Sequence, residues 1–153
     1  MDFILLLDTS GSMYGEQGEK ILALNLAVSG LFEGFLRMSP EPNIAIITFG
    51  GTAQLRDFSP ASEIPQHAYE ARGTTPLTEA LALAEPLDAL NVTTILLSDG
   101  AADDNEFSAL RLQGDAYAIA IGADADYEQL ARFTRNPAHV FSPSEGRLPW
   151  TLH

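Results

Sequence analysis

The sequence contains no cysteine among its 153 residues. Without thiols the chain can form no disulfide bond, hold no thiolate-bound zinc and use no cysteine nucleophile. A chain without disulfides suits a reducing compartment. We therefore expect a cytoplasmic protein.

Basic residues are also scarce. The chain has 8 Lys and Arg against 21 Asp and Glu, which gives a formal charge of −13, and Lys20 is its only lysine. Proteins that bind nucleic acid or anionic membrane surfaces use Lys and Arg to neutralise phosphates. We therefore expect neither nucleic acid nor a membrane as a partner.

Long hydrophobic runs are missing as well. The apolar run Phe3 to Leu7 is too short for the core of a signal peptide and has no basic segment before it. Polar residues and glycines interrupt the stretch from Ile21 to Met38, so it fails the requirement of about 18 apolar residues for a membrane span. We expect no export signal, no transmembrane segment and a single domain over residues 1–153.

Apolar segments alternate with helical patterns along the chain. The predicted strands are 3–7, 44–49, 52–55, 94–97, 116–121 and 139–141. The predicted helices are 17–38, 77–85, 106–112 and 127–133. Gly50 and Gly51 suit a tight hairpin between the second and third strands, and residues 59–75 are predicted to be irregular, with room for one short helix. This order predicts an α/β fold, a doubly wound, Rossmann-like three-layer sandwich around a mostly parallel sheet.

Oxygen-bearing side chains follow the ends of two predicted strands. Asp8, Ser10 and Ser12 come directly after the first strand, and Asp99 follows the fourth. Thr75 lies in a loop just before a predicted helix. Ligand sites of doubly wound sheets lie beyond the carboxyl ends of the strands, and hard divalent cations prefer oxygen ligands. The sequence therefore predicts a divalent cation site at this edge.

Three motifs carry a resemblance to a known family. The run D-x-S-x-S at 8–12, the run G-x-T-P-L at 73–77 and the run S-D-G at 98–100 resemble, in order and spacing, those of the von Willebrand factor A (vWA) domain with its metal-ion-dependent adhesion site (MIDAS). The resemblance covers nearly the whole chain and is closest in character to small stand-alone bacterial members of the tellurite-resistance type. It implies a six-stranded sheet in the order 3-2-1-4-5-6, with the third strand antiparallel.

The resemblance also implies a site and a function. Ser10, Ser12 and Thr75 would hold Mg²⁺, or else Mn²⁺ or Ca²⁺, through their hydroxyls, while Asp8 and Asp99 would act mainly through water. A cation with few anionic ligands keeps an open position, which a Glu or Asp of a partner protein fills. The resemblance thus implies a metal-dependent protein-protein interaction module, monomeric when free, that acts in a bacterial stress or tellurite-resistance complex or in an ATPase-associated one.

Each motif also has a simpler interpretation. The side chains of 8–12 could cap a helix, and Thr75 before Pro76 could merely open one, with Thr74 as the neighbouring alternative ligand. Asp99 could form an Asx turn with the glycine that follows it. These local roles need no metal.

Four further acids lie near the same edge in sequence. Asp103, Asp104, Asp124 and Asp126 could support a second cation or steer a partner, but acidic residues also favour the first turn of a helix. We expect them to repel an acidic surface. The acid that a partner presents should therefore sit in a neutral or basic surround.

Two other functions compete with this hypothesis. Asp8 could be the nucleophile of a Mg²⁺-dependent phosphohydrolase of the haloacid dehalogenase kind, but that chemistry needs a second acid where Ser10 stands and a lysine late in the chain, where there is none. We therefore expect no enzyme. The other alternative is a metal-independent scaffold whose motif is vestigial.

The C-terminal part departs from the family pattern. Family members close with a long helix after the last strand, and in some that helix slides when ligand binds. Residues 142–150 contain two prolines and a glycine, which predicts no long helix there. The resemblance therefore does not extend to the sliding switch.

Overall fold

A computed structural model describes residues 2–101 and 112–143, and in this part of the chain six strands form one sheet in the order β3-β2-β1-β4-β5-β6. The strands are β1 (Asp2–Asp8), β2 (Asn43–Gly50), β3 (Thr52–Pro60), β4 (Val92–Ser98), β5 (Ala116–Ala120) and β6 (Val140–Phe141). Neighbouring strands pair in parallel except β2 and β3, which are antiparallel. The predicted fold class, strand order and antiparallel third strand are confirmed.

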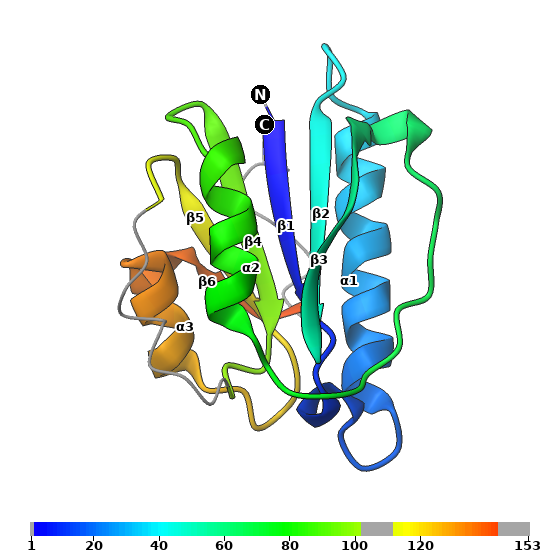
Figure 1. The fold of residues 1–153 in the computed structure, drawn as a ribbon, viewed down its shortest axis with the longest axis vertical. Helices are drawn as coiled ribbons and strands as arrows, with labels where there is room; N and C mark the ends of the chain where they lie inside the picture. Colours follow the sequence, from blue (N-terminus) through cyan, green and yellow to red (C-terminus); the bar gives the residue numbers. More distant parts are fainter. Residues whose placement is uncertain (1, 102–111, 144–153) are drawn as a thin grey trace.

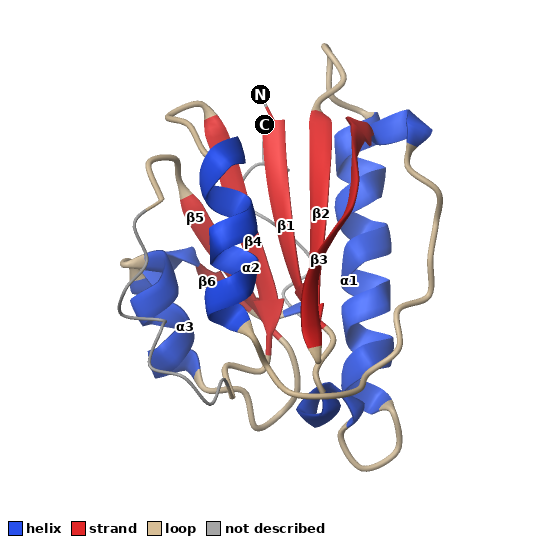
Figure 2. Ribbon diagram, in the orientation of Figure 1, coloured by secondary structure: helices blue, strands red, loops and turns tan. Residues whose placement is uncertain are grey.

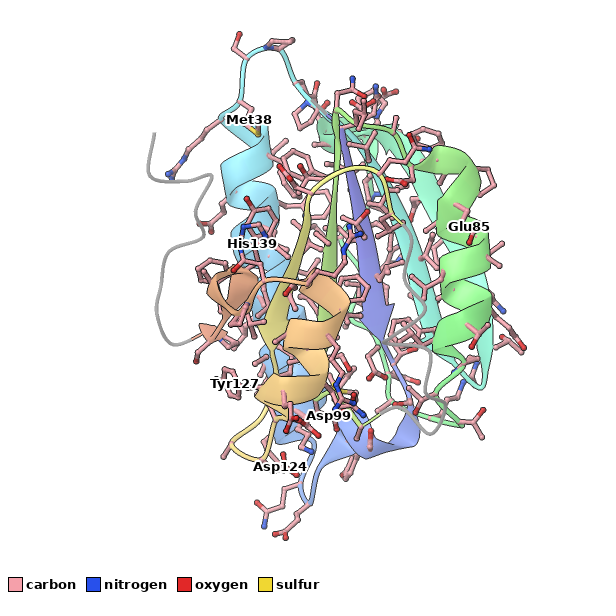
Figure 3. The ribbon with its side chains drawn as sticks, turned by 90° about the vertical axis from the view of Figure 1, so that its left-hand side faces the viewer. Met38, Glu85, Asp99, Asp124, Tyr127 and His139 are labelled. Atoms are coloured by element: carbon pink, nitrogen blue, oxygen red, sulfur yellow. The ribbon has the colours of Figure 1, made fainter. Side chains whose placement is uncertain are left out.

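The helices form the two outer layers (Figures 1 and 2). They are α1 (Glu19–Leu36), α2 (Leu77–Ala84) and α3 (Tyr127–Thr134). Short 3₁₀ turns are η1 (Gly11–Tyr14), η2 (Ala61–Glu63), η3 (Glu85–Leu87) and η5 (Pro137–His139). Figure 3 shows α1 and α2 on opposite sides of the sheet. None of the described helices is both long and apolar enough to cross a membrane.

The core has two halves, one on each face of the sheet. Leu5 and Leu7 of β1 pack in the cluster that includes the buried face of α1, whereas Ile4 and Leu6 pack in the cluster that includes α2 and α3. Every residue of β1 after Asp2 is buried. A central strand covered on both faces needs apolar side chains at successive positions, which explains the unbroken run in the sequence.

The third strand is longer than predicted. The sequence suggests a strand over 52–55, and this is wrong, because β3 continues to Pro60 and pairs with β2 along its whole length, with a register shift between Ile46 and Ile47. As an edge strand, β3 leaves Leu55 and Phe58 exposed beside charged residues, so it lacks the apolar pattern of a buried strand. The predicted helix at 106–112 and most of the C-terminal segment 142–150 lie outside the described residues.

Candidate metal-binding site

Asp8 ends β1 with a buried carboxylate. Its Oδ1 accepts hydrogen bonds from the Ser10 backbone N–H at 3.0 Å and from the Ser10 Oγ at 2.5 Å. Its Oδ2 accepts one from the Ser98 Oγ at 2.6 Å. Burial is the largest influence on this group and raises the pKa of Asp8 to about 6, although the hydrogen bonds oppose the rise, and the charge of Asp99 adds to it.

Asp8 lacks a positive partner in the part of the chain that the structure describes. Among the described residues its carboxylate takes part in no ion pair. An anion that is out of water and lacks a counter-charge is costly to the folded state. A bound cation would lower that cost, so the chemistry of this strand end fits a metal.

Two hydroxyls extend the site from Asp8 toward solvent. The Oγ atoms of Ser10 and Ser12 lie 3.3 Å apart, and Ser10 is buried while Ser12 is exposed. Ser10 stands at the N-cap of η1, yet its side chain makes no capping bond. The helix-capping interpretation therefore does not account for these hydroxyls.

The loop that carries Thr75 is fastened to the loop after β1. The Arg72 N–H donates to the Thr9 carbonyl at 2.8 Å, and the Gly11 N–H donates to the Gly73 carbonyl at 2.8 Å. Thr75, two residues after Gly73 in the sequence, is buried. The cap position of α2 is Pro76, with no side-chain capping bond, and the Thr75 carbonyl accepts from the Leu77 N–H at 2.9 Å at the start of this helix.

Glycines allow these loops to approach so closely. A Cβ at Gly73, where φ is +81°, would lie 2.6 Å from the Cα of Gly51 at the tip of the β2–β3 hairpin. A Cβ at Gly50 would lie 2.2 Å from the Thr9 carbonyl oxygen. Real Cβ atoms are not found at such distances, so bare backbone is needed where the hairpin, the first loop and the 73–75 loop meet.

Asp99 follows β4 and is nearly as buried as Asp8, with 3% of the residue exposed. Its Oδ1 accepts from the Ala101 N–H at 3.0 Å, which is the predicted Asx turn. Its Oδ2 accepts from the Lys20 Nζ at 3.2 Å. Asp99 thus combines a local turn with a long-range ion pair.

Lys20 joins two of the acids at this edge, and Figure 3 labels both of them, Asp99 and Asp124. Its Nζ lies 2.8 Å from the Asp124 Oδ1 and 3.0 Å from the Oδ2. Burial alone would lower the pKa of Lys20, but the two carboxylates outweigh it and raise that pKa, while the hydrogen bond from Lys20 lowers the pKa of Asp124.

The other acids near the edge have different outcomes. Asp126 is the N-cap of α3 and accepts from the Gln129 N–H at 3.1 Å, so its helix-start interpretation is confirmed. Asp124 instead pairs with Lys20. Asp103 and Asp104 lie outside the described residues, and their roles in steering or in a second cation site stay predictions.

Two residues of the site were not predicted from the sequence, Ser98 and Lys20. Ser98 belongs to the S-D-G motif, and its hydroxyl accepts from the Gly100 N–H of its own loop at 3.0 Å while it donates to Asp8 on the neighbouring strand. Lys20 is marked in the sequence only by being the sole lysine. Within 2–101 and 112–143 no group of three or more His, Cys, Asp or Glu side chains could hold a metal ion, so a metal here would depend on hydroxyl ligands as well as on carboxylates.

Comparison with solved structures identifies the class of fold. Proximal thread matrix protein 1 from the mussel byssus is 21% identical with a TM-score of 0.68, over 92% of this chain and 41% of that one. The ArnB paralog VWA2 from Sulfolobus acidocaldarius is 21% identical with a TM-score of 0.72, over 95% and 42%. The chain thus spans about two fifths of the length of these two proteins.

Two similar structures contain metal. The mussel protein has also been solved with a zinc-occupied MIDAS motif. The manganese-loaded TRAP protein of Plasmodium vivax is 18% identical with a TM-score of 0.71, over 95% of this chain and 70% of that one. No protein-family model matches the sequence, and no curated protein matches it.

The fold and these comparisons define the class. This chain is a doubly wound α/β protein, and its fold is that of the von Willebrand factor A domain. The resemblance in the sequence motifs is thereby confirmed at the level of the fold.

Proposed function

We propose that this chain is a metal-dependent protein-interaction module in which Asp8, Ser10, Ser12, Thr75 and Asp99 hold a divalent cation. The buried Asp8 carboxylate, which hydroxyls contact and which forms no ion pair with any described residue, is the observation that carries the proposal. A bound cation would supply the missing charge and an electrophilic position for a carboxylate oxygen of a partner protein. The likeness to vWA proteins that were solved with metal supports this assignment.

Mg²⁺ is the cation that we propose, with Mn²⁺ and Ca²⁺ as alternatives. All five donor side chains offer oxygen, and none offers nitrogen or sulfur. Such a set favours hard cations over softer ones.

The proposed partner presents a Glu or Asp from a neutral or basic surface. The chain carries a formal charge of −13, so a strongly acidic partner surface would be repelled before its carboxylate reached the metal. The contact with the partner's carboxylate thus depends on the bound metal ion, a local positive charge in a protein of negative net charge. We propose that the free chain is a monomer.

We propose a binding role rather than catalysis. Lys20 does bring an ammonium to this edge, but it contacts Asp99 and not Asp8. The position of the second acid of a phosphohydrolase is occupied by Ser10, whose hydroxyl is bonded to Asp8. We expect no hydrolysis of a generic phosphoester such as p-nitrophenyl phosphate. Activity that Asp8→Asn abolished would revive the phosphohydrolase alternative.

The test is affinity capture from an extract of the source cell, in Mg²⁺ and in EDTA. Wild type should retain its partner in Mg²⁺ and release it in EDTA, and Asp8→Ala should retain nothing. Thr75→Ala should release the partner faster than wild type does. Ser29→Ala, which removes an exposed hydroxyl from α1, is the matched control and should behave as wild type. A partner that stays bound in EDTA would contradict the proposal.

A further inference from the structure

Lys20 is anchored at the candidate metal site by more than its charge. Its side chain is 11% exposed, although it begins at the second residue of α1. The aliphatic part passes over bare backbone at Gly122, where φ is +95° and a Cβ would lie 2.9 Å from the Lys20 Cε. The glycine leaves the space that the lysine stem fills on its way to Asp99.

The two partners of Lys20 differ in exposure. The Asp99 side chain is 2% exposed, whereas the Asp124 side chain is 71% exposed. Water and salt screen the charge of Asp124 strongly and that of Asp99 weakly. The inner pair, between Lys20 and Asp99, therefore has the greater influence on the field at the site.

Lys20 also changes the net charge of the site. Asp8 and Asp99 together carry two negative charges when ionised, and Lys20 cancels one of them. A site that already holds a fixed cation attracts a divalent cation less strongly than the same site without it. Asp99 must also share its Oδ2 with the ammonium, which makes that oxygen a poorer ligand for a metal or for a metal-bound water.

We infer that Lys20 is a built-in counter-cation that weakens divalent metal binding at this site. Filling the site therefore requires a higher metal concentration than it would without Lys20. The inference rests on the proposed function, because it concerns the same site. It adds a residue that neither the motifs nor the fold assigns. It also explains why a buried Asp99 is tolerated when no metal is bound.

The test is the dissociation constant of Mn²⁺ alone, measured by titration calorimetry or by the electron paramagnetic resonance signal of free Mn²⁺. Lys20→Met should tighten Mn²⁺ binding about tenfold, because one fixed positive charge is lost. Lys20→Arg keeps the charge and should stay within about threefold of wild type. In EDTA, Lys20→Met should melt at a lower temperature than Lys20→Arg, since Asp99 loses its counter-ion.

A second pair of variants keeps the fold intact at exposed positions. Asp124→Asn leaves Asp99 as the one carboxylate partner of Lys20 among the described residues and should weaken Mn²⁺ binding about threefold. Glu128→Gln removes a charge from α3 that is likewise exposed and that pairs with Arg132 rather than with Lys20, and should leave the constant unchanged.

The outcomes separate the two hypotheses. If wild type binds Mn²⁺ and Asp8→Ala does not, the proposed site stands. An unchanged constant in Lys20→Met, or tighter binding in Asp124→Asn, would then overturn the role of Lys20 alone. If wild type binds no Mn²⁺, the proposed function fails and this inference fails with it.

Discussion

Asp8 ends β1 and Asp99 directly follows the neighbouring parallel strand β4. Both are buried, but their charges are compensated differently. Asp8 is held by hydroxyls and a backbone N–H and has no cationic partner among the described residues. Asp99 is paired with the ammonium of Lys20. The carboxylate of Asp99 is thus neutralised by the protein itself. The carboxylate of Asp8 has no counter-charge among the described residues, and an external cation can supply one.

The largest expected effect comes from supplying that charge. At a concentration about a thousandfold above its dissociation constant, Mg²⁺ or Mn²⁺ should raise the free energy of unfolding by about 4 kcal/mol. Differential scanning calorimetry should show the rise for wild type and none for Asp8→Ala. An equal rise in the variant would move the cation to another site.

The second effect is a pH dependence in the absence of metal. The pKa of Asp8 is raised from 3.8 to about 6 in the folded protein, so the folded state binds its proton more tightly than the unfolded state does. Its contribution to stability is complete below about pH 4 and is lost as the pH rises to about 6, a change of about 3 kcal/mol.

Denaturant unfolding in EDTA at pH 4 to 7 measures that loss. Asp8→Asn cannot ionise, so the difference between wild type and the variant should grow across this range in favour of the variant. Other acids titrate in both proteins and cancel in the difference. A constant difference would mean that burial of Asp8 carries no such cost.

The third effect concerns the contact of the loop that carries Thr75 with the β2–β3 hairpin. Gly73→Ala forces a side chain into a positive φ and against the backbone of Gly51. We expect a loss of about 2 kcal/mol in unfolding free energy together with weaker metal binding. Gly30→Ala is the matched control, since nothing lies within 4 Å of a Cβ there, and it should stabilise α1 by about 0.5 to 1 kcal/mol.

The smallest effect concerns an acid at the same edge that caps a helix. Asp126 caps α3, so Asp126→Ala should cost about 1 kcal/mol and leave the metal response of the melting temperature intact. Loss of that response would make Asp126 part of the site.

Much of the fold could be predicted because local patterns decide it. The apolar run of β1 reflects its burial on both faces, and Gly50 and Gly51 indicate the hairpin. The length of β3 could not be predicted, because an edge strand owes its extent to pairing with β2 rather than to its own apolar pattern.

The site was predictable only in part, for a similar reason. Asp8, Ser10 and Ser12 lie close together in sequence, so one motif indicates them. Lys20 pairs with Asp99 and Asp124, which lie 79 and 104 positions further along the chain. No local sequence pattern connects these residues. The path of its side chain depends on the packing of α1 against the loop after β5, which only the folded chain defines.

We propose above that a divalent cation binds at the Asp8 strand end. The most direct measurement is an anomalous difference map from a crystal grown with Mn²⁺. We expect one strong peak in contact with the hydroxyls of Ser10, Ser12 and Thr75. A peak elsewhere, or none at a Mn²⁺ concentration that saturates binding in solution, would contradict it.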